Sequence, residues 1–242
     1  MGDIVKVGWS GGKDSSCAVM LHILRGDKVK AVCYIPMFTN EIPLIQKKHY
    51  DFIMKTADKF RSLGAEINII HGITYWDYVQ KVTKRGINKG KIYGFPCFIA
   101  GRCGFNRDSK SKVCKEFDVG EYNYESIGIA FDEVKRHNQL NNKKRSILVE
   151  EEFTEAMTYP FDREHGILSP IYDDTNIKRD GCALCPHANK YERETWFRDY
   201  PEARELVIQL QDIVKEKRPD RPPLRNYEYF IETDVIQLSI FD

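Results

Sequence analysis

Hydrophobic and polar positions alternate between two patterns along the first hundred residues. Short apolar runs rich in valine and isoleucine are typical of buried strands, and apolar stripes recurring every three or four positions are typical of helices, here ending at Gly26 and Gly64. The predicted strands are 3–9, 29–35 and 67–71, and the predicted helices are 13–25, 43–63 and 74–85. Because strands joined by helices of this length need right-handed crossovers, the pattern predicts an α/β fold with a doubly wound, mainly parallel sheet.

The pattern weakens after Gly86. It predicts further strands at 126–131 and 146–149 and a helical stretch at 191–217 that Pro201 interrupts, whereas the proline-rich residues 218–225 exclude regular structure. The expected organisation is an α/β domain at 1–175, a small cysteine-containing helical subdomain at 176–217, and a proline-rich linker with a C-terminal tail at 218–242.

Composition gives no global reason to expect a nucleic-acid or membrane partner. The 242 residues include 37 Lys and Arg against 36 Asp and Glu, which gives a formal net charge of +1. No signal peptide and no apolar run as long as a membrane span is present, so we expect a cytoplasmic protein that does not bind membranes. The cytoplasm keeps thiols reduced, so the clustering among the seven cysteines indicates metal or redox chemistry before disulfides.

A glycine-rich turn follows the first predicted strand and precedes the first predicted helix. It reads S-G-G-K-D-S at positions 10–15, and its backbone N–H groups together with the helix amino end make an anion site. A Walker A loop would need glycine where Val7 stands and Ser or Thr where Asp14 stands, and glycines 8, 11 and 12 do not fit a dinucleotide fingerprint. We therefore expect the turn to bind phosphate through a different motif, at the carboxyl end of a strand.

The S-G-G-x-D-S turn resembles the PP-loop ATP pyrophosphatases, which have the adenine nucleotide alpha hydrolase-like fold. The resemblance implies that the loop holds the β and γ phosphates of ATP while the enzyme breaks the α–β bond and releases pyrophosphate. It also implies that Lys13 and Asp14 act in catalysis, because Lys13 adds positive charge and Asp14 can hold Mg²⁺. The implied ATP- and pyrophosphate-binding residues are Ser10, Gly11, Gly12, Lys13, Asp14 and Ser15.

Two cysteines downstream form a C-x-x-C motif, Gly181-Cys-Ala-Leu-Cys-Pro186. Alone, this motif is either a redox pair or half of a metal site. The candidates for the other half are the upstream cysteines Cys97, Cys103 and Cys114.

The order of several motifs resembles the phosphoadenosine phosphosulfate (PAPS) reductase-like family, including phage and DNA-modification members. The matching segments are Gly94-Phe-Pro, Arg102-Cys103, Lys110, the stretch 128–136, the C-x-x-C motif and Trp196, over about the first 200 residues. The chain departs from the family pattern in lacking Trp beside Cys103 and in having Ala130 and Val134 where Arg and Ser are expected.

This second resemblance implies two further sites. The implied second-substrate residues are Arg102, Lys110, Gly128, Asp132, Glu133 and Arg136. The implied metal ligands are Cys103, Cys182, Cys185 and Cys97, with Cys114 as the alternative fourth ligand. Thiolates select an iron–sulfur cluster or zinc, and the two alternatives stay open here. The remaining cysteines, Cys17 and Cys33, are expected to pack in the core.

Two further segments bear on partners. Residues 81–115 contain ten cations and a single acid, Asp108, which suits a sulfonucleotide, a nucleic-acid backbone or a solvated loop. Residues 237–241, Q-L-S-I-F, resemble the peptide by which bacterial DNA-processing proteins bind the sliding clamp, although a terminal strand on the protein's own sheet explains them as well.

The expected function is an enzyme that uses ATP and Mg²⁺ to adenylylate an acceptor, coupled to sulfur transfer to a nucleic acid or nucleotide through the cysteine site. One alternative is a sulfonucleotide reductase. The reductases that use thioredoxin carry a catalytic cysteine in a C-terminal segment, and this chain has no cysteine after Cys185. The other alternative is a nucleotide-binding module without turnover, recruited to a DNA complex by its tail.

Overall fold

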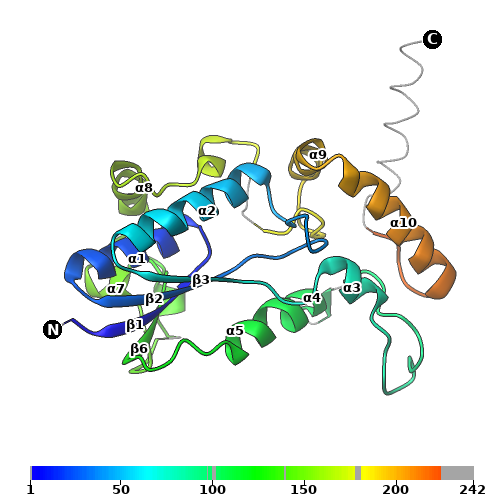
Figure 1. Ribbon diagram of the computed structural model, residues 1–242, viewed down its shortest axis with the longest axis horizontal. Helices are drawn as coiled ribbons and strands as arrows, with labels where there is room; N and C mark the ends of the chain where they lie inside the picture. The colour runs from blue at the N-terminus through cyan, green and yellow to red at the C-terminus, as the bar shows by residue number, and fades with distance from the viewer. Residues whose placement is uncertain (1, 97, 100–101, 139, 178–180, 225–242) are drawn as a thin grey trace, which may run out of the picture.

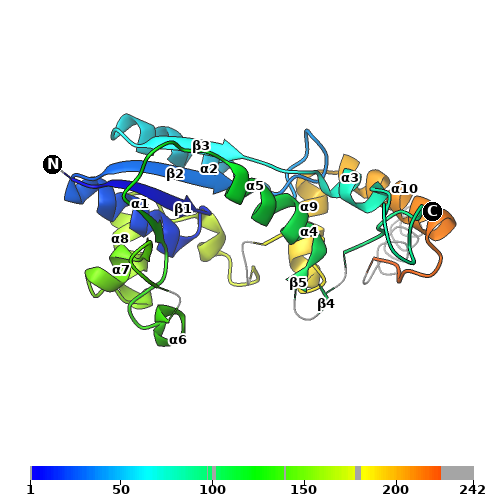
Figure 2. The ribbon, with the colours of Figure 1, turned by 90° about the horizontal axis from the view of Figure 1, so that it is seen from below.

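The computed structural model describes residues 2–96, 98–99, 102–138, 140–177 and 181–224, with only the backbone at 98, 99 and 102. Figures 1 and 2 show the main sheet toward one end of the molecule and α3 and α10 toward the other. The strands are β1 (Ile4–Trp9), β2 (Lys28–Tyr34), β3 (Glu66–Ile70), β4 (Phe98–Ile99), β5 (Arg102–Cys103), β6 (Tyr124–Ile127) and β7 (Lys144–Arg145). The helices are α1 (Lys13–Arg25), α2 (Lys47–Ser62), α3 (Tyr75–Gln80), α4 (Gly104–Asn106), the π-helix η1 (Arg107–Ser111), α5 (Lys112–Glu116), α6 (Val134–His137), α7 (Ile147–Glu150), α8 (Glu155–Glu164), the 3₁₀ helix η2 (Pro170–Asp173), α9 (Lys190–Asp199) and α10 (Glu202–Lys217).

The main sheet of the described residues has the strand order β3-β2-β1-β6-β7, and each neighbouring pair is parallel. Val7 of β1 lies opposite Ala31 of β2 on one side and Ser126 of β6 on the other. The α/β class and the mainly parallel sheet are therefore confirmed, and the arrangement is compatible with a doubly wound fold. The chain moves outward from β1 to β3 and then returns to β6 beside β1, so the carboxyl end of β1 lies at the switch point where such sheets bind ligands.

Successive side chains of the central strand β1 point to opposite faces of the sheet, and helices pack on the face that carries its apolar residues. Val5, Val7 and Trp9 face one side, where they pack in a cluster with apolar residues of α1 and α2. On the other face Val32 and Ile70 pack with residues of α5. Figure 1 shows α2 and α5 on opposite sides of the strands. The helices α1 and α2 thus bury one face along β1, whereas α5 covers the other face only beside Val32 and Ile70, which fits the alternation of apolar residues with Lys6 and Lys30 along β1 and β2.

The predicted helices 43–63 and 74–85 are shorter in the structure. The second ends at Gln80, because beyond it the chain pairs with a returning segment: the Thr83 N–H donates to the Lys91 carbonyl over 2.9 Å. The first begins only at Lys47, because the preceding residues are held in an extended path where the Leu44 N–H donates to the Pro36 carbonyl over 2.8 Å. Helical periodicity alone did not reveal these competing backbone hydrogen bonds.

Two predicted strands also need correction. The strand predicted at 126–131 is β6 and ends at Ile127, because the chain then leaves the sheet toward the glycine-rich loop. The segment 146–149 is wrong as a strand: it forms the short helix α7, in which the Glu150 N–H donates to the Ser146 carbonyl over 3.1 Å. A run of three apolar residues, here Ile147 to Val149, does not separate a short strand from a buried helical turn.

The C-terminal helices share a hydrophobic cluster with earlier parts of the chain. The predicted interruption at Pro201 is confirmed, since α9 ends at Asp199 and α10 begins at Glu202. Trp196 of α9 packs at the centre of a cluster that also contains Phe38 and the α3 aromatics. Residues 218–224 contain no regular structure, as predicted, yet Leu224 is buried in the same cluster. Among the helices described, none is long and apolar enough to cross a membrane.

Candidate functional site

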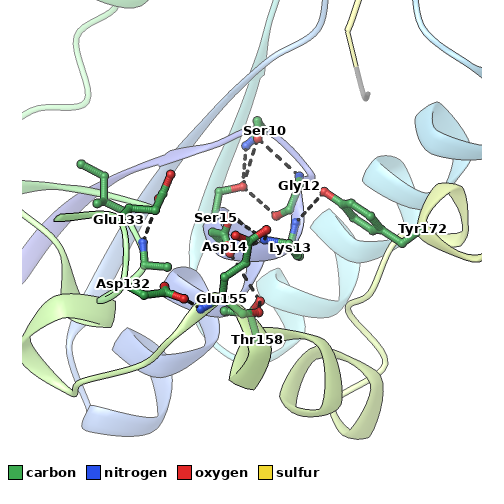
Figure 3. Close-up of polar contacts among 12 residues, drawn as sticks. Ser10, Gly12, Lys13, Asp14, Ser15, Asp132, Glu133, Glu155, Thr158 and Tyr172 are labelled. Atoms are coloured by element: carbon green, nitrogen blue, oxygen red, sulfur yellow. Dashed lines mark hydrogen bonds and ion pairs between the residues drawn. The ribbon is translucent and has the colours of Figure 1, made fainter. Parts of the chain in front are cut away.

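The turn at 10–15 connects β1 to α1 and is held in shape by its own hydrogen bonds. The Ser15 hydroxyl donates to the Gly12 carbonyl over 2.9 Å and accepts from the Ser10 N–H over 3.1 Å, as Figure 3 shows. Gly11 has a φ of +78°, and a Cβ there would lie 2.5 Å from the Ile53 side chain of α2. The turn therefore requires glycine at this position, and it presents backbone N–H groups at the amino end of α1, where they favour an anion.

The Lys13 ammonium lies between two carboxylates next to the turn. Its Nζ is 2.9 Å from Asp14 Oδ1 and 3.0 Å from Glu155 Oε1 (Figure 3). Burial alone would lower the pKa of Lys13, but the hydrogen bonds to Asp14 and Glu155 outweigh it and hold that pKa above its ordinary value. Lys13 therefore stays charged, and a bound polyphosphate would compete with the two carboxylates for it.

Three residues of α8 that the sequence did not single out lie beside the turn. Glu155 binds Lys13, and the Thr158 hydroxyl lies 3.4 Å from Asp14 Oδ1. Asp162 is fully buried, and neither of its carboxyl oxygens has a hydrogen-bond partner among the described residues. The spacing of 155, 158 and 162 puts all three on one helix face, a signal that appears only once a helix is recognised there.

Asp162 carries a proton at neutral pH. Burial, with a smaller contribution from the nearby Asp14 carboxylate, raises the pKa of Asp162 to about 8. A buried carboxyl that finds no cation or donor is stabilised in its neutral form. The site thus combines a partly exposed carboxylate, Asp14, which pairs with Lys13, and a buried carboxyl, Asp162, whose pKa is raised.

Two residues predicted for a second substrate adjoin the turn at 10–15. A Cβ at Gly128 would lie 2.7 Å from the Ser15 backbone nitrogen, so this glycine allows β6 to pass close to the start of α1. Asp132 accepts a hydrogen bond from the Glu155 N–H over 2.9 Å (Figure 3). Gly128 and Asp132 therefore position the loop and its acidic neighbour.

Glu133 and Arg136, also predicted for the second substrate, bind each other. Arg136 Nη1 lies 2.7 Å from Glu133 Oε1, and Glu133 Oε2 accepts from the Ala130 N–H over 3.0 Å. This arrangement closes the turn after β6, and neither residue lines the cavity described next.

A cavity of about 790 Å³ lies at the carboxyl ends of β1 and β2, a volume typical of small-molecule sites. Ser10 of the phosphate turn lines it together with Cys103, Cys182 and Cys185. Cys103 precedes α4, and the two later cysteines lie in a turn that is fixed where the Ala183 N–H donates to the Leu44 carbonyl over 2.9 Å. Three of the predicted ligands thus line one cavity.

The other predicted ligands are placed differently. Cys114 packs beside Val32 and Val119 on the far face of the sheet, and it does not line the cavity. Cys97 and the Arg102 side chain lie outside the described residues. Within those residues, no three His, Cys, Asp or Glu side chains converge closely enough to hold a metal ion. The two remaining cysteines, at positions 17 and 33, are fully buried in the core.

The π-helix η1 forms a cationic wall of the cavity. Arg107 and the predicted second-substrate residue Lys110 both line it, and Lys110 Nζ lies 6.0 Å from the centre of the Tyr34 ring. Ser109 anchors this turn: its hydroxyl donates to the Ile73 carbonyl over 2.8 Å and lies 2.6 Å from the Tyr34 hydroxyl. A π turn rotates side chains relative to an α-helix and is frequent at functional sites.

His49 is a cavity residue that no sequence spacing identified. It belongs to α2, is only 2% exposed, and its Nδ1 lies 2.8 Å from the Ser169 hydroxyl. Its Cε1 is 3.0 Å from the position of a Cβ built on Gly11, so the ring packs directly against the phosphate turn. The cavity therefore has an imidazole beside the turn and thiols farther along its wall.

Comparison with known proteins returned no match to any protein-family model and no match to a curated protein. The loop, the acidic face of α8 and the thiol-lined cavity are therefore the observations from which a function follows. The predicted clamp-binding segment, 237–241, lies outside the described residues.

Proposed function

We propose that the protein is a PP-loop enzyme that binds ATP at residues 10–15, cleaves it between the α and β phosphates, and transfers the adenylyl group to an acceptor that then receives sulfur. The observation that carries this proposal is the shared cavity: Ser10 of the turn and three cysteines line the same space of about 790 Å³. A nucleotide held by the turn would have its reacting end close to nucleophilic sulfur.

The turn supplies groups suited to a departing pyrophosphate. The amino end of α1 favours negative charge, and its N–H groups are held in place before a ligand binds. The Gly12 N–H donates to the Ser10 hydroxyl over 3.3 Å and the Lys13 N–H to the Tyr172 hydroxyl over 3.1 Å, and a bound phosphate would replace these two acceptors. Lys13 would move from its carboxylates to the phosphates, where its charge offsets the charge that develops on the leaving group. Asp14 fits a Mg²⁺ ligand because it is partly exposed beside the turn.

The acceptor chemistry would proceed in two displacements. An acceptor oxygen attacks the α phosphorus, and pyrophosphate leaves with both electrons of the broken P–O bond. A sulfur nucleophile then attacks the activated acceptor atom, and AMP leaves with the former acceptor oxygen. Cys103, Cys182 and Cys185 have the donor chemistry of an iron–sulfur cluster, with zinc as the alternative, and such a cluster would supply a site for the incoming sulfur.

The deciding experiment is radiolabelled pyrophosphate release from ATP with candidate acceptors. We expect release in the wild-type protein and a loss of about 100-fold or more in Lys13→Ala and Asp14→Asn, because each removes charge placed for the transition state. The exposed Lys28→Ala is the matched control and should behave as wild type. Saturable ATP binding without pyrophosphate release would support a binding module instead, and release of sulfite from PAPS would support a sulfonucleotide reductase.

A further inference from the structure

The chain forms a projecting hairpin between α3 and the cysteine region. Residues 81–93 run out and back, with an antiparallel bridge between Val82 and Ile92. The Thr83 N–H donates to the Lys91 carbonyl and the Gly90 N–H donates to the Thr83 carbonyl, each over 2.9 Å. Figure 1 shows the segment that follows α3 extending away from the rest of the molecule. The hairpin therefore has its own backbone pairing and a defined tip.

The base of this hairpin is fixed to the body. Ile92 is only 7% exposed and belongs to the cluster around Trp196, and Arg218 donates a hydrogen bond to the Ile92 carbonyl. Lys81 Nζ lies 5.1 Å from the centre of the Tyr93 ring and 3.1 Å from Asp108 Oδ2. A tip carried on such an anchored base is presented in a defined direction.

The tip combines a fully exposed apolar side chain with uncompensated positive charge. Ile87 is 97% exposed. Lys84, Arg85 and Lys89 surround it in sequence and are exposed, and none of the carboxylates that the structure describes pairs with them. Single exposed apolar residues are common, but an isoleucine at the end of a structured arm among three unpaired cations suits a polyanion with apolar interior surfaces.

We propose that the hairpin 81–93 is a nucleic-acid-binding element, in which Lys84, Arg85 and Lys89 contact phosphates and Ile87 inserts against the bases. Apolar wedges flanked by cations are a known means of entering and unstacking base steps. This inference deepens the proposed function, because it makes the acceptor of that reaction a nucleic acid. The binding role of the hairpin stands by itself, and only the reaction carried out on the bound nucleic acid rests on the proposed function.

The hairpin and the cavity are linked by one acid. Asp108 binds Lys81 at the base of the hairpin over 3.1 Å and Arg107 of the cavity wall over 2.7 Å. Arg107 and Lys81, which share the Asp108 carboxylate, thus form a track between the cavity wall, which also contains Lys110, and the base of the hairpin. A strand bound along this track would have its phosphates compensated while one nucleotide reaches the cavity.

A membrane surface is the other polyanion that such a tip could meet, but the hairpin fits it less well. It offers a single apolar side chain, whereas even a whole acyl chain gives only reversible attachment to a bilayer. A two-stranded arm, by contrast, has the width that a nucleic-acid groove admits. Vesicle binding is therefore an outcome of the test.

The test measures binding of the full-length protein to fluorescent 30-base-pair DNA, a structured RNA and a single strand over a range of salt concentrations. In the triple variant Lys84→Gln, Arg85→Gln, Lys89→Gln, we expect the slope of log affinity against log salt to fall by roughly 2.7 for duplex DNA, since each phosphate contact contributes about 0.9. The matched control, Lys28→Gln, Lys55→Gln, Lys143→Gln, removes equal charge from exposed lysines outside the hairpin and should bind as wild type.

Ile87→Ser tests the wedge separately. It should keep the salt slope but weaken binding roughly tenfold, because the apolar contact is lost. It should also abolish the fluorescence increase of 2-aminopurine placed in the duplex, which reports unstacking. Leu24→Ser, also at an exposed apolar position, is its control.

Equal binding by wild type and triple variant, or binding of the wild type to anionic phospholipid vesicles alone through Ile87, would overturn the inference. The two proposals fail separately. Pyrophosphate release with small acceptors but no nucleic-acid binding removes only the hairpin's role. Hairpin-dependent binding without any use of ATP removes only the proposed enzyme.

Discussion

At the scale of single residues, Asp162 ties the stability of the site to pH. Its pKa is raised to about 8 by burial and by Asp14, whereas an unfolded chain releases that proton near the ordinary value of about 4. Between these values the folded protein binds one more proton than the unfolded chain. The contribution of the Asp162 proton to the free energy of unfolding is fully present below pH 4 and is lost as the pH rises toward 8.

Asp162→Asn should therefore flatten the pH dependence of stability. Between pH 5 and 7 we expect the free energy of unfolding of the wild type to fall relative to the variant by up to about 1.4 kcal/mol per pH unit, the limit for one proton. Urea unfolding at pH 5, 6 and 7 measures this difference. Parallel profiles for the two proteins would mean that the Asp162 carboxyl is ionised or partnered in the folded state.

A second arrangement at this scale invites a catalytic interpretation that its burial excludes. His22 Nδ1 lies 2.7 Å from Asp27 and its Nε2 lies 2.8 Å from the Ser126 hydroxyl, an order of groups found in serine hydrolases. His22 and Ser126 are fully buried between α1 and β6, so no substrate can reach them. Burial lowers the pKa of His22 and outweighs the effect of Asp27, so the ring is neutral and serves as a structural link.

Ser126→Ala should separate these two interpretations. We expect a loss of about 1 to 2 kcal/mol in the free energy of unfolding, because the buried imidazole nitrogen loses its partner, with ATP use unchanged. Urea unfolding and pyrophosphate release measure the two quantities. A loss of turnover at full stability would contradict the structural role.

At the scale of elements, the end of β6 approaches the start of α1 so closely that Gly128 does not accommodate a larger side chain. Substitution of Gly128 is therefore expected to displace the turn at 10–15. An added Cβ would meet backbone atoms of Asp14 and Ser15 at 2.7 to 2.9 Å, which cannot move like a flexible side chain. At Gly8, on the neighbouring strand β1, an added Cβ would come no closer than 4.0 Å to the Ser126 carbonyl oxygen. Gly8 in β1 and Gly128 directly after β6 thus differ in whether they tolerate an added Cβ.

Gly128→Ala should weaken ATP binding by displacing the turn, and it should lower the free energy of unfolding by about 1 to 3 kcal/mol, as overpacking does. Gly8→Ala, the matched control, should bind ATP as wild type. Isothermal titration with a non-hydrolysable ATP analogue checks both. Equal ATP affinities in the two variants would show that β6 does not position the turn.

Local patterns predicted the elements near the phosphate turn and failed farther away, for physical reasons. The strand–turn–helix unit 3–25 was predictable because its apolar period and its glycines act locally. The hairpin 81–93 is not predictable from local pattern because its ladder depends on pairing across ten residues. The helix α8 is not predictable because Pro160 stands inside it, and proline ordinarily ends a helix. Cys103 and the C-x-x-C motif could be grouped from the family resemblance, whereas the place of His49 in the cavity depends on tertiary packing.

At the scale of the whole molecule, two hydrophobic clusters meet at the thiol-lined cavity. The sheet cluster around Val7 positions the phosphate turn, and the cluster around Trp196 positions the C-x-x-C turn and α4. Figure 2 shows α4 and α9 beyond the carboxyl ends of the strands, where the cavity lies. The two halves of the site therefore pack on different hydrophobic clusters.

This separation allows the cysteines to be sorted by metal content. After purification without oxygen, we expect iron and sulfide, or zinc as the alternative, to be lost in Cys103→Ser and Cys182→Ser, because both residues line the cavity. Cys114→Ser should retain full metal, since Cys114 packs on the opposite face of the sheet beside Val32. ATP binding should persist in all three variants, because the turn at 10–15 belongs to the other core. Loss of metal in Cys114→Ser alone would instead assign the site to that face, and retention of metal in every variant would exclude these thiols as its ligands.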